Sequence, residues 1–125
     1  MESLVWVMAG GGLGAALRFI VFRRVAVMVK HVFPWPTLVV NLSGSFLMGF
    51  LLGSFENHLI NEQIRALIFT GFLGSYTTFS TISNEVVLAL REKLYKTAIA
   101  DILIHMIGGI ALALLGYNLG FSEVF

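Results

Sequence analysis

The sequence contains no cysteine, only two prolines and few charged residues, and these shortages exclude several classes of protein. Without cysteine the chain has no disulfide bond and no thiolate metal site. Charged residues make up 12% of the chain, whereas soluble domains carry about 25%. The net charge is only +1 and no basic run alternates with aromatic residues, so nothing indicates nucleic acid as a partner.

Apolar residues are abundant instead, at 58% of the chain, and the mean hydropathy is +0.90. This composition indicates an all-α integral membrane protein, which we expect to form a single transmembrane domain over residues 1–125. The N-terminal sequence MESLVW lacks the basic region of a cleavable signal peptide, and no small-residue cleavage pattern follows it. We therefore expect the first helix to remain in the mature protein.

Four apolar stretches predict four transmembrane helices, at about residues 4–29, 37–55, 62–93 and 97–119. As one straight helix with a rise of about 1.5 Å per residue, the third stretch would be roughly 48 Å long. That length is well beyond a hydrocarbon core of about 30 Å. A break near residues 74–78 is therefore predicted in the middle of the third stretch.

The predicted break lies in the segment GFLGSYTTFSTISNE, residues 71–85. Six hydroxyl side chains and a carboxylate lie here between almost wholly apolar flanks, so these groups must face something polar. Gly71 and Gly74 are candidates for the end of a first half-helix. Three residues are candidates for capping the second: Ser75, Thr77 and Thr78. Irregular backbone at membrane depth is tolerated only inside protein or beside a wet cavity, so the segment predicts a site for an ion or a substrate.

Small residues on the first span favour close helix packing, since Gly10 and Gly14 lie four positions apart on one face. Arg18 lies on the same span, about 21 Å along the helix from Leu4, and therefore within the bilayer. Two interpretations of this arginine remain open. Its guanidinium extends along the helix to the interface, or it stands in a vestibule where it attracts anions.

The second span carries a stripe of small and polar residues that recur every four positions: Thr37, Asn41, Ser45, Gly49 and Gly53. One helix face is expected to pack or to line a path, while Leu, Val, Phe and Met on the other face meet lipid. Asn41 needs a partner because an unpaired amide at this depth costs free energy. From the residue alone, an interhelical hydrogen bond is the favoured interpretation.

The fourth span repeats this spacing with Asp101, His105, Gly109 and Ala113. Asp101 and His105 can pair one helical turn apart, which predicts a charge-neutralised contact near one interface. A lone histidine on an apolar helix is more often a satisfied core residue than a ligand. No HxxxH, HExxH or cysteine pair accompanies it, so no transition-metal site is predicted.

Basic residues favour one side of the membrane. The connections at residues 23–30 and 91–96 share a side and hold six Lys/Arg, whereas the opposite side has Arg65 alone near a span end. The positive-inside rule then predicts that both termini lie outside.

Four motifs occur in order along nearly the whole chain: GGGLGAALRF, PTLVVNLSGSFLMG, TGFLGSYTTFSTISNE and HMIGG. With them the sequence resembles the Fluc, or CrcB, family of fluoride channels. The resemblance implies a channel in the cell (inner or plasma) membrane that exports fluoride passively and lowers its cytoplasmic concentration. It also implies an antiparallel, dual-topology dimer of four-helix subunits, with two fluoride pores and a structural sodium ion on the two-fold axis.

The charge bias leaves two protein partners open for such a dimer: a second copy of the chain, or an oppositely biased paralogue. The identical copy is favoured, because a broken span needs a second broken span to complete the cation site. Membrane lipid is expected to surround the helices in either case.

By matching position, the resemblance assigns roles to individual residues. The backbone carbonyls of Gly74 and Thr77 would hold the sodium ion. Phe79 matches the first aromatic residue of the family's pore pair, Asn41 a pore-side amide, and Arg18 the vestibule arginine. The remaining matches lie on or near the polar track: Thr37, Ser80, Thr81, Ser83 and His105.

Two positions depart from the family pattern. Ile82 stands where the second pore phenylalanine is expected, so a mechanism that needs two ring edges does not follow from the resemblance. Gly109 stands where the fourth helix often carries a hydroxyl. That leaves a gap in the polar track for water, His105 or a neighbouring hydroxyl to fill.

The chemistry of fluoride agrees with this set of residues. Fluoride is small and strongly hydrated, so a pore must replace its water with hydroxyl, amide and aromatic-edge donors. A small proton-coupled exporter remains the alternative, with Glu85 as its titrating carboxylate, about 12 Å beyond Thr77 along the second half-helix. An intramembrane enzyme is the least favoured class, because no serine, histidine and acid set comes with a nucleophile turn.

Overall fold

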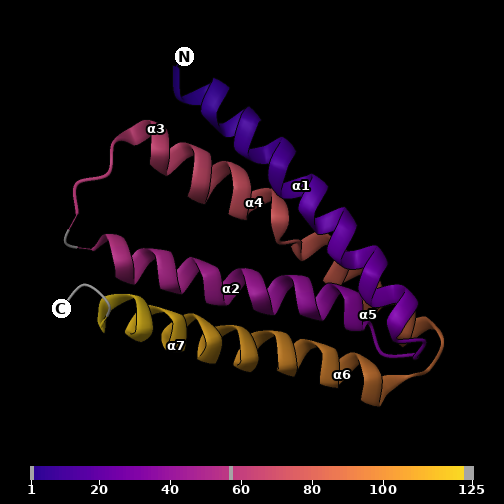
Figure 1. Cartoon of the computed structure of the whole chain (residues 1–125). Helices are drawn as coiled ribbons and strands as arrows, with labels where there is room; N and C mark the ends of the chain where they lie inside the picture. The colour runs from indigo at the N-terminus through magenta and orange to yellow at the C-terminus, as the bar shows by residue number, and fades with distance from the viewer. Residues whose placement is uncertain (1, 57, 123–125) are drawn as a thin grey trace.

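The computed structural model describes residues 2–56 and 58–122, and all the regular structure in these residues is helical (Figure 1). The first two helices are α1 (Glu2–Met28) and α2 (Trp35–Phe55). A third stretch follows, made of α3 (Glu62–Arg65), the π-helix η1 (Ala66–Leu73), α4 (Gly74–Tyr76) and α5 (Phe79–Arg91). The fourth stretch consists of α6 (Tyr95–Leu103), the π-helix η2 (Ile104–Gly108) and α7 (Gly109–Ser122).

Each stretch runs opposite to the one before it. The start of α1, the connection from α2 to α3 and the end of α7 lie at one end of the molecule, and the other two connections lie at the opposite end (Figure 1). Among the residues described, three helices are long and apolar enough to cross a membrane: α1, α2 and the continuous helix Tyr95–Ser122. The third stretch is divided, so neither of its halves reaches that length alone. The chain therefore has the architecture of an α-helical membrane protein.

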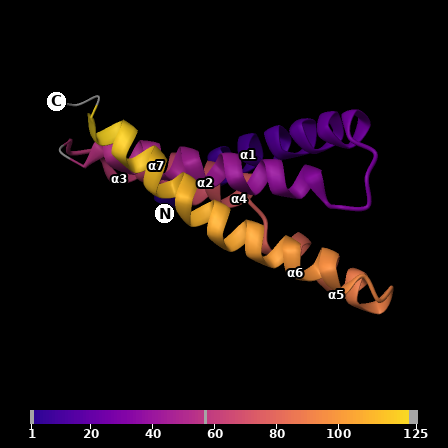
Figure 2. The ribbon, with the colours of Figure 1, turned by 90° about the horizontal axis from the view of Figure 1, so that it is seen from below.

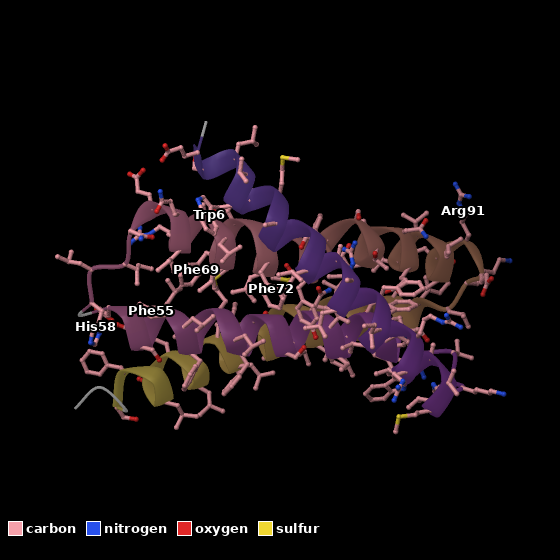
Figure 3. The ribbon with its side chains drawn as sticks, turned by 45° about the horizontal axis from the view of Figure 1, so that its top comes forward. Trp6, Phe55, His58, Phe69, Phe72 and Arg91 are labelled. Carbon is pink, nitrogen blue, oxygen red and sulfur yellow. The ribbon has the colours of Figure 1, made fainter. Side chains whose placement is uncertain are left out.

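The helices pack as two antiparallel pairs. α1 packs along η1 and α4, and α2 packs along α7. The pairs touch where the ring of Phe55 in α2 meets that of Phe69 in η1 edge to face, with centroids 6.5 Å apart (Figure 3). α5 packs on α6, and Figure 2 shows both diverging from α1 at the end that carries their connection.

Glycine brings the helices of each pair into backbone contact. A Cβ on Gly10 or Gly14 of α1 would collide with the carbonyl oxygens of Leu67 and Phe72 respectively, both in η1. A Cβ on Gly49 of α2 would collide with a carbonyl of α7. The close packing predicted for Gly10 and Gly14 is present. In lipid such van der Waals contact is what holds helices together, because apolar side chains gain nothing by leaving lipid tails.

Gly10→Ala is expected to lower the melting temperature of the protein in detergent, because the new methyl group meets backbone that cannot move aside. Overpacking of this kind costs about 1–3 kcal/mol. Gly12→Ala is the matched control on the same helix, since nothing lies within 4 Å of a Cβ at Gly12. Equal melting temperatures for the two variants would contradict this account of the packing.

The third stretch leaves the helical conformation at Thr77 and Thr78. Thr77 has φ −82° and ψ 158°, and Thr78 has φ −147° and ψ 121°, so both residues are extended. Thr78 is the N-cap of α5, where its hydroxyl accepts a hydrogen bond from the Thr81 amide at 3.3 Å. The other two cap candidates bond elsewhere, since Ser75 donates to a carbonyl of α1 and Thr77 to a carbonyl of its own half-helix.

The prediction that Gly71 and Gly74 end the first half-helix is wrong. Gly74 has helical angles, φ −62° and ψ −33°, and the helix continues to Tyr76. Gly71 serves close packing instead, since a Cβ there would lie 2.6 Å from the Val7 carbonyl oxygen in α1. The half-helix is also π-helical over Ala66–Leu73, a wider winding that the pattern of residues did not predict and that often marks functional sites.

Candidate functional site

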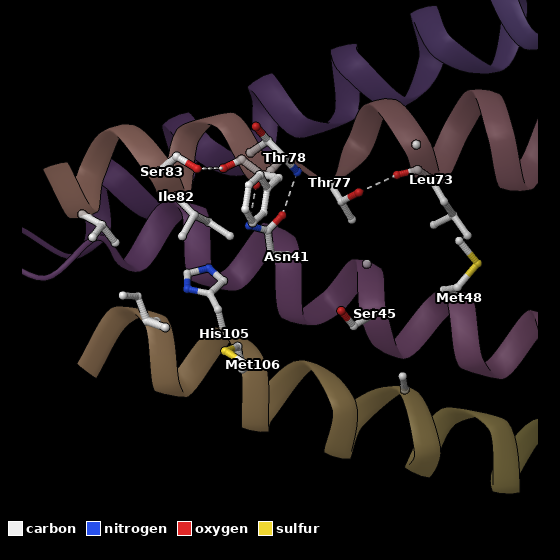
Figure 4. Close-up of a pocket in the computed structure, with 16 residues that line it drawn as sticks. Asn41, Ser45, Met48, Leu73, Thr77, Thr78, Ile82, Ser83, His105 and Met106 are labelled. Atoms are coloured by element: carbon white, nitrogen blue, oxygen red, sulfur yellow. Dashed lines mark hydrogen bonds between the residues drawn. The ribbon is translucent and has the colours of Figure 1, made fainter. Parts of the chain in front are cut away.

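A cavity of about 860 Å³ lies beside the break, bounded by the third stretch, α2 and the fourth stretch (Figure 4). Most of the residues in its wall are apolar: seven Leu, Ile, Val, Met and Phe residues, two glycines and an alanine. Polar residues from three parts of the chain also reach it: Asn41 and Ser45 from α2, Thr77, Thr78 and Ser83 from the third stretch, and His105 from η2. A concave apolar wall with a few convergent polar groups is the usual form of a binding site.

Asn41 holds the break in place. Its side-chain amide donates to the Thr78 carbonyl oxygen at 2.9 Å, and its Oδ1 accepts from the Thr78 amide at 2.8 Å (Figure 4). One side chain, only 8% exposed, thus satisfies both backbone groups of an extended residue that no helix pairs. The interhelical hydrogen bond expected for Asn41 is present, and Asn41 also lines the cavity.

The hydroxyl residues around the break divide into two groups. Thr77, Thr78 and Ser83 line the cavity, whereas Ser80 and Thr81 are absent from its wall. Ser80 and Thr81 cluster around Thr78 instead, with their hydroxyl oxygens 3.3 Å and 3.0 Å from its Oγ1. Ser83 donates at 3.2 Å to the carbonyl oxygen one turn back in α5. The fold therefore brings only part of the predicted hydroxyl row to the cavity.

Phe79 and Ile82 line the cavity from the first turn of α5. Phe79 follows the N-cap directly and is 81% exposed, so most of its ring faces out of the chain. Ile82 is half-buried and lies across the cavity from His105 (Figure 4). Because a branched aliphatic side chain has no ring edge, Phe79 supplies the aromatic group of this wall.

Gly74 and Thr77 line the cavity at the end of the first half-helix. The last carbonyl groups of a helix have no partner within it and carry partial negative charge, so this end suits a cation. Within 4 Å, a Cβ on Gly74 would meet the Phe69 carbonyl oxygen alone, at 3.7 Å, so the backbone here is open to approach. The described residues include no cluster of three or more His, Asp or Glu suited to a metal.

Thr37 lies outside the cavity wall. It is fully buried, and its hydroxyl donates to Glu85 Oε1 at 2.6 Å, which ties α2 to α5. The other carboxyl oxygen, Glu85 Oε2, is buried and has no hydrogen-bond partner in the described part of the chain. The fold thus joins Thr37 to a carboxyl group, and its place on the polar track stays a prediction.

Asp101 and His105 form the pair that their spacing predicts. His105 Nδ1 lies 3.0 Å from Asp101 Oδ1 and 2.9 Å from the Asp101 backbone carbonyl oxygen. Asp101 is 2% exposed, while the His105 ring extends from η2 across the cavity toward Asn41 and Ile82 (Figure 4). The pair therefore connects a buried carboxylate with the cavity wall.

Arg18 does not contribute to the cavity wall. It is partly exposed on α1, the helix that packs against the first half of the third stretch. Its place in a vestibule therefore stays a prediction.

Ser45 is a cavity residue that was missing from the predicted set, although the stripe on the second span contained it. Serine in a helix commonly bonds back to a carbonyl one turn earlier, as Ser54 does to Phe50. The Ser45 hydroxyl makes no hydrogen bond with any residue that the structure describes. Its oxygen lies 3.5 Å from the point where a Cβ on Gly109 would stand. A hydroxyl group of α2 therefore lies beside Gly109.

The long apolar helices, together with a divided span beside a cavity, define a multi-pass α-helical membrane protein. Residues 5–117 match the model of the family described as CrcB-like protein, Camphor Resistance (CrcB). The chain belongs to this family.

Three relatives from different organisms bear the same name, fluoride-specific ion channel FluC. That of Shewanella frigidimarina (strain NCIMB 400) is 40% identical over 124 residues, covering 99% of this chain and 100% of the relative. That of Azobacteroides pseudotrichonymphae genomovar. CFP2 is 39% identical over 120 residues, covering 95% and 96%. That of Ignicoccus hospitalis is 37% identical over 119 residues, covering 95% of each chain.

Proposed function

We propose that the protein is a fluoride-selective channel that passes fluoride passively across the cell membrane and so lowers its cytoplasmic concentration. The relatives named as fluoride-specific channels match this chain over nearly its whole length. The observation that carries the proposal is the cavity at the break, where polar groups from three parts of the chain face an otherwise apolar space.

The cavity wall offers groups that can replace the water around fluoride. Ser45 has a hydroxyl with no bond to the described residues, Asn41 has a second N–H on its amide, and Phe79 contributes an aromatic ring. The ring edge is the positive part of the aromatic quadrupole. Hydroxyl and amide donors can replace the tightly held water of a small anion such as fluoride, whereas chloride is larger and needs a wider ring of contacts.

A second copy of the chain, antiparallel to the first, is proposed to complete the pore. Most of the Phe79 ring lies outside the fold of one chain, although the cavity beside it is lined by Asn41 and His105. A partner over this face would cover the ring and close the pathway. An identical chain supplies the same break by two-fold symmetry, and membrane lipid covers the remaining helix faces.

A structural sodium ion at the centre of this dimer belongs to the proposal. The carbonyl oxygens of Gly74 and Thr77 are the proposed ligands, because they lie at the end of the first half-helix and the backbone at Gly74 is open. Two antiparallel copies would bring two such ends together, and their negative partial charges suit a cation. The fixed positive charge would then favour an anion nearby.

A proton-coupled exporter is the second candidate, because Glu85 is a carboxyl group with one buried oxygen that lacks a partner in the described part of the chain. An acid within a membrane segment is a functional candidate by default. Such an exporter would need a proton gradient, whereas a channel needs only a gradient of fluoride.

Fluoride efflux from liposomes that hold the purified protein tests both candidates. A channel is expected to pass fluoride at equal pH on the two sides, and to pass chloride far more slowly. Comparable fluoride and chloride fluxes would contradict the channel. A flux that requires a pH gradient would support the exporter instead.

The charge bias of the connections makes assembly a separate test. If an identical copy completes the pore, the protein expressed alone is expected to form dimers with a terminal tag accessible from both sides of the membrane. A tag reached from one side only, with flux that needs a co-expressed relative of opposite bias, would establish a pair of different chains.

Ser45→Ala is expected to lower fluoride flux by about two- to tenfold, the equivalent of one neutral hydrogen bond. Adding Gly109→Ser is expected to restore flux, because a Cβ there meets no atom closer than the Ser45 hydroxyl oxygen at 3.5 Å. Ser43→Ala is the control, since that hydroxyl bonds to Val40 and Tyr76 away from the cavity wall. If the double variant passes fluoride as slowly as Ser45→Ala, a hydroxyl group at this position is not what supports the flux.

A further inference from the structure

The buried pair in the fourth stretch determines which nitrogen of His105 carries a proton. Nδ1 lies 2.9 Å from the backbone carbonyl oxygen of Asp101 and 3.0 Å from its Oδ1. A carbonyl oxygen can only accept a hydrogen bond, so Nδ1 is the donor and holds the first proton of the ring. In the neutral ring, Nε2 is therefore a bare lone pair.

Nε2 is the part of this ring that is left for a ligand. It is buried, and it has no hydrogen-bond partner among the residues that the structure describes. The His105 side chain is 7% exposed, and its ring extends into the cavity wall toward Asn41 and Ile82 (Figure 4). Since a buried polar atom without a partner is costly, a ligand in the cavity is the natural partner of Nε2.

The kind of ligand that Nε2 accepts depends on the charge of the ring. The bare lone pair of the neutral ring repels an anion, whereas the Nε2–H of the imidazolium donates a charge-assisted hydrogen bond to it. The Asp101 carboxylate lies close enough to balance the positive charge, so the protonated pair as a whole is neutral.

We propose that His105 is a proton-dependent anion contact of the cavity and that Asp101 is the residue that positions it. This inference rests on the proposed fluoride channel and adds regulation to the same site. Fluoride meets an N–H at His105 when the ring is protonated and a lone pair when it is not. Conduction therefore falls as the pH rises and the ring loses its proton.

Glu85 is the other titratable group that faces this pair. It projects from α5 within electrostatic reach of Asp101 and His105, and Thr37 of α2 donates to its Oε1 at 2.6 Å. The remaining elements packed here add no charge, since neither α2 nor α7 contains a charged residue. An experiment on pH dependence must therefore separate the Glu85 carboxyl group from the imidazole.

Fluoride efflux at equal pH inside and outside the liposomes, from about pH 6 to about pH 8.5, tests the inference. Flux from protein-free liposomes is subtracted at each pH to remove the leak of hydrogen fluoride. Wild-type flux is expected to fall roughly tenfold over this range, the equivalent of one charge-assisted hydrogen bond. Asp101→Asn removes the balancing charge and is expected to move the midpoint of the profile to lower pH.

His105→Gln and Glu85→Gln complete the test. A glutamine places an amide N–H close to the position of Nε2 at every pH, so His105→Gln is expected to conduct without a pH dependence. Glu85→Gln is expected to keep a pH-dependent flux, with its midpoint moved to lower pH because one negative charge within reach of the ring is lost. If the flux of that variant is the same at every pH, the titrating group is Glu85 and the role of His105 is overturned.

The failure of this inference differs from the failure of the proposed function. Wild-type fluoride flux that stays constant over the pH range would overturn the inference and leave the channel intact. Absence of fluoride flux at every pH would overturn the channel itself. Size-exclusion chromatography checks each variant for assembly. If His105→Gln does not assemble, the inference is tested by the pH dependence of flux in the wild type and in Asp101→Asn. Equal midpoints for these two proteins would then overturn it.

Discussion

Asn41→Leu is expected to reduce fluoride flux to the background of protein-free liposomes and to lower the stability of the protein. Leucine has a similar size, but it can make neither of the hydrogen bonds, at 2.8 Å and 2.9 Å, that hold the backbone of Thr78. A backbone group left unpaired in apolar surroundings costs about 1–3 kcal/mol. The extended residues of the break would rearrange to recover these bonds, and Thr77 and Phe79 would leave the cavity wall.

Asn61→Ala is the matched control for that variant. Asn61 is also an asparagine whose Oδ1 accepts a backbone hydrogen bond, from the Ile64 amide at 2.8 Å, but it caps α3 far along the chain from the break. Losing this cap is expected to cost about 1 kcal/mol and to leave fluoride flux unchanged. Wild-type flux from Asn41→Leu would mean that other contacts hold the break.

Phe79→Ile is expected to reduce fluoride flux roughly tenfold while the protein still assembles. Since 81% of the residue is exposed in one chain, the ring contributes little to packing within that chain. Isoleucine keeps the apolar bulk and removes the positive ring edge, and Ile82 on the same wall has no edge to replace it. Efflux and size-exclusion chromatography measure the two effects separately.

Two further variants define the role of the ring. Ile82→Phe is expected to conduct as well as the wild type, because it adds a ring edge to a wall that already holds Phe79. Phe22→Ile is the control, as it exchanges the same residue types on α1, away from the cavity wall. If Phe79→Ile conducts normally, the ring serves packing and the anion contacts are hydroxyl and amide groups.

Contacts within one turn of a helix could be predicted from spacing. Residues four apart share a helix face, so Asp101 and His105 were expected to pair, and they do. The depth of Asn41 required a partner, and the structure supplies one in the backbone of Thr78. Both results follow from rules that involve one helix, or one residue and its burial.

Contacts between stretches could not be predicted in this way. The hydroxyl row after the break looks uniform in the sequence, yet Ser83 reaches the cavity while Ser80 and Thr81 cluster at the N-cap. Which of these hydroxyl groups faces the cavity depends on the rotation of α5 about its own axis. That rotation depends in turn on the packing of α5 against α6. The same packing brings Glu85 to Thr37, across 48 positions of sequence.

The sequence by itself determined that this is a helical membrane protein, which family it resembles, and that its third stretch is too long to cross as one helix. These conclusions follow from composition, length and motif order, which do not depend on contacts between helices. Only the tertiary structure decided that Gly71 packs against α1 rather than ending a helix, that the Ser45 hydroxyl lies beside Gly109, and that Nε2 of His105 has no protein partner in the described chain. These depend on how closely one helix backbone approaches another, and that distance is set jointly by residues far apart in the chain.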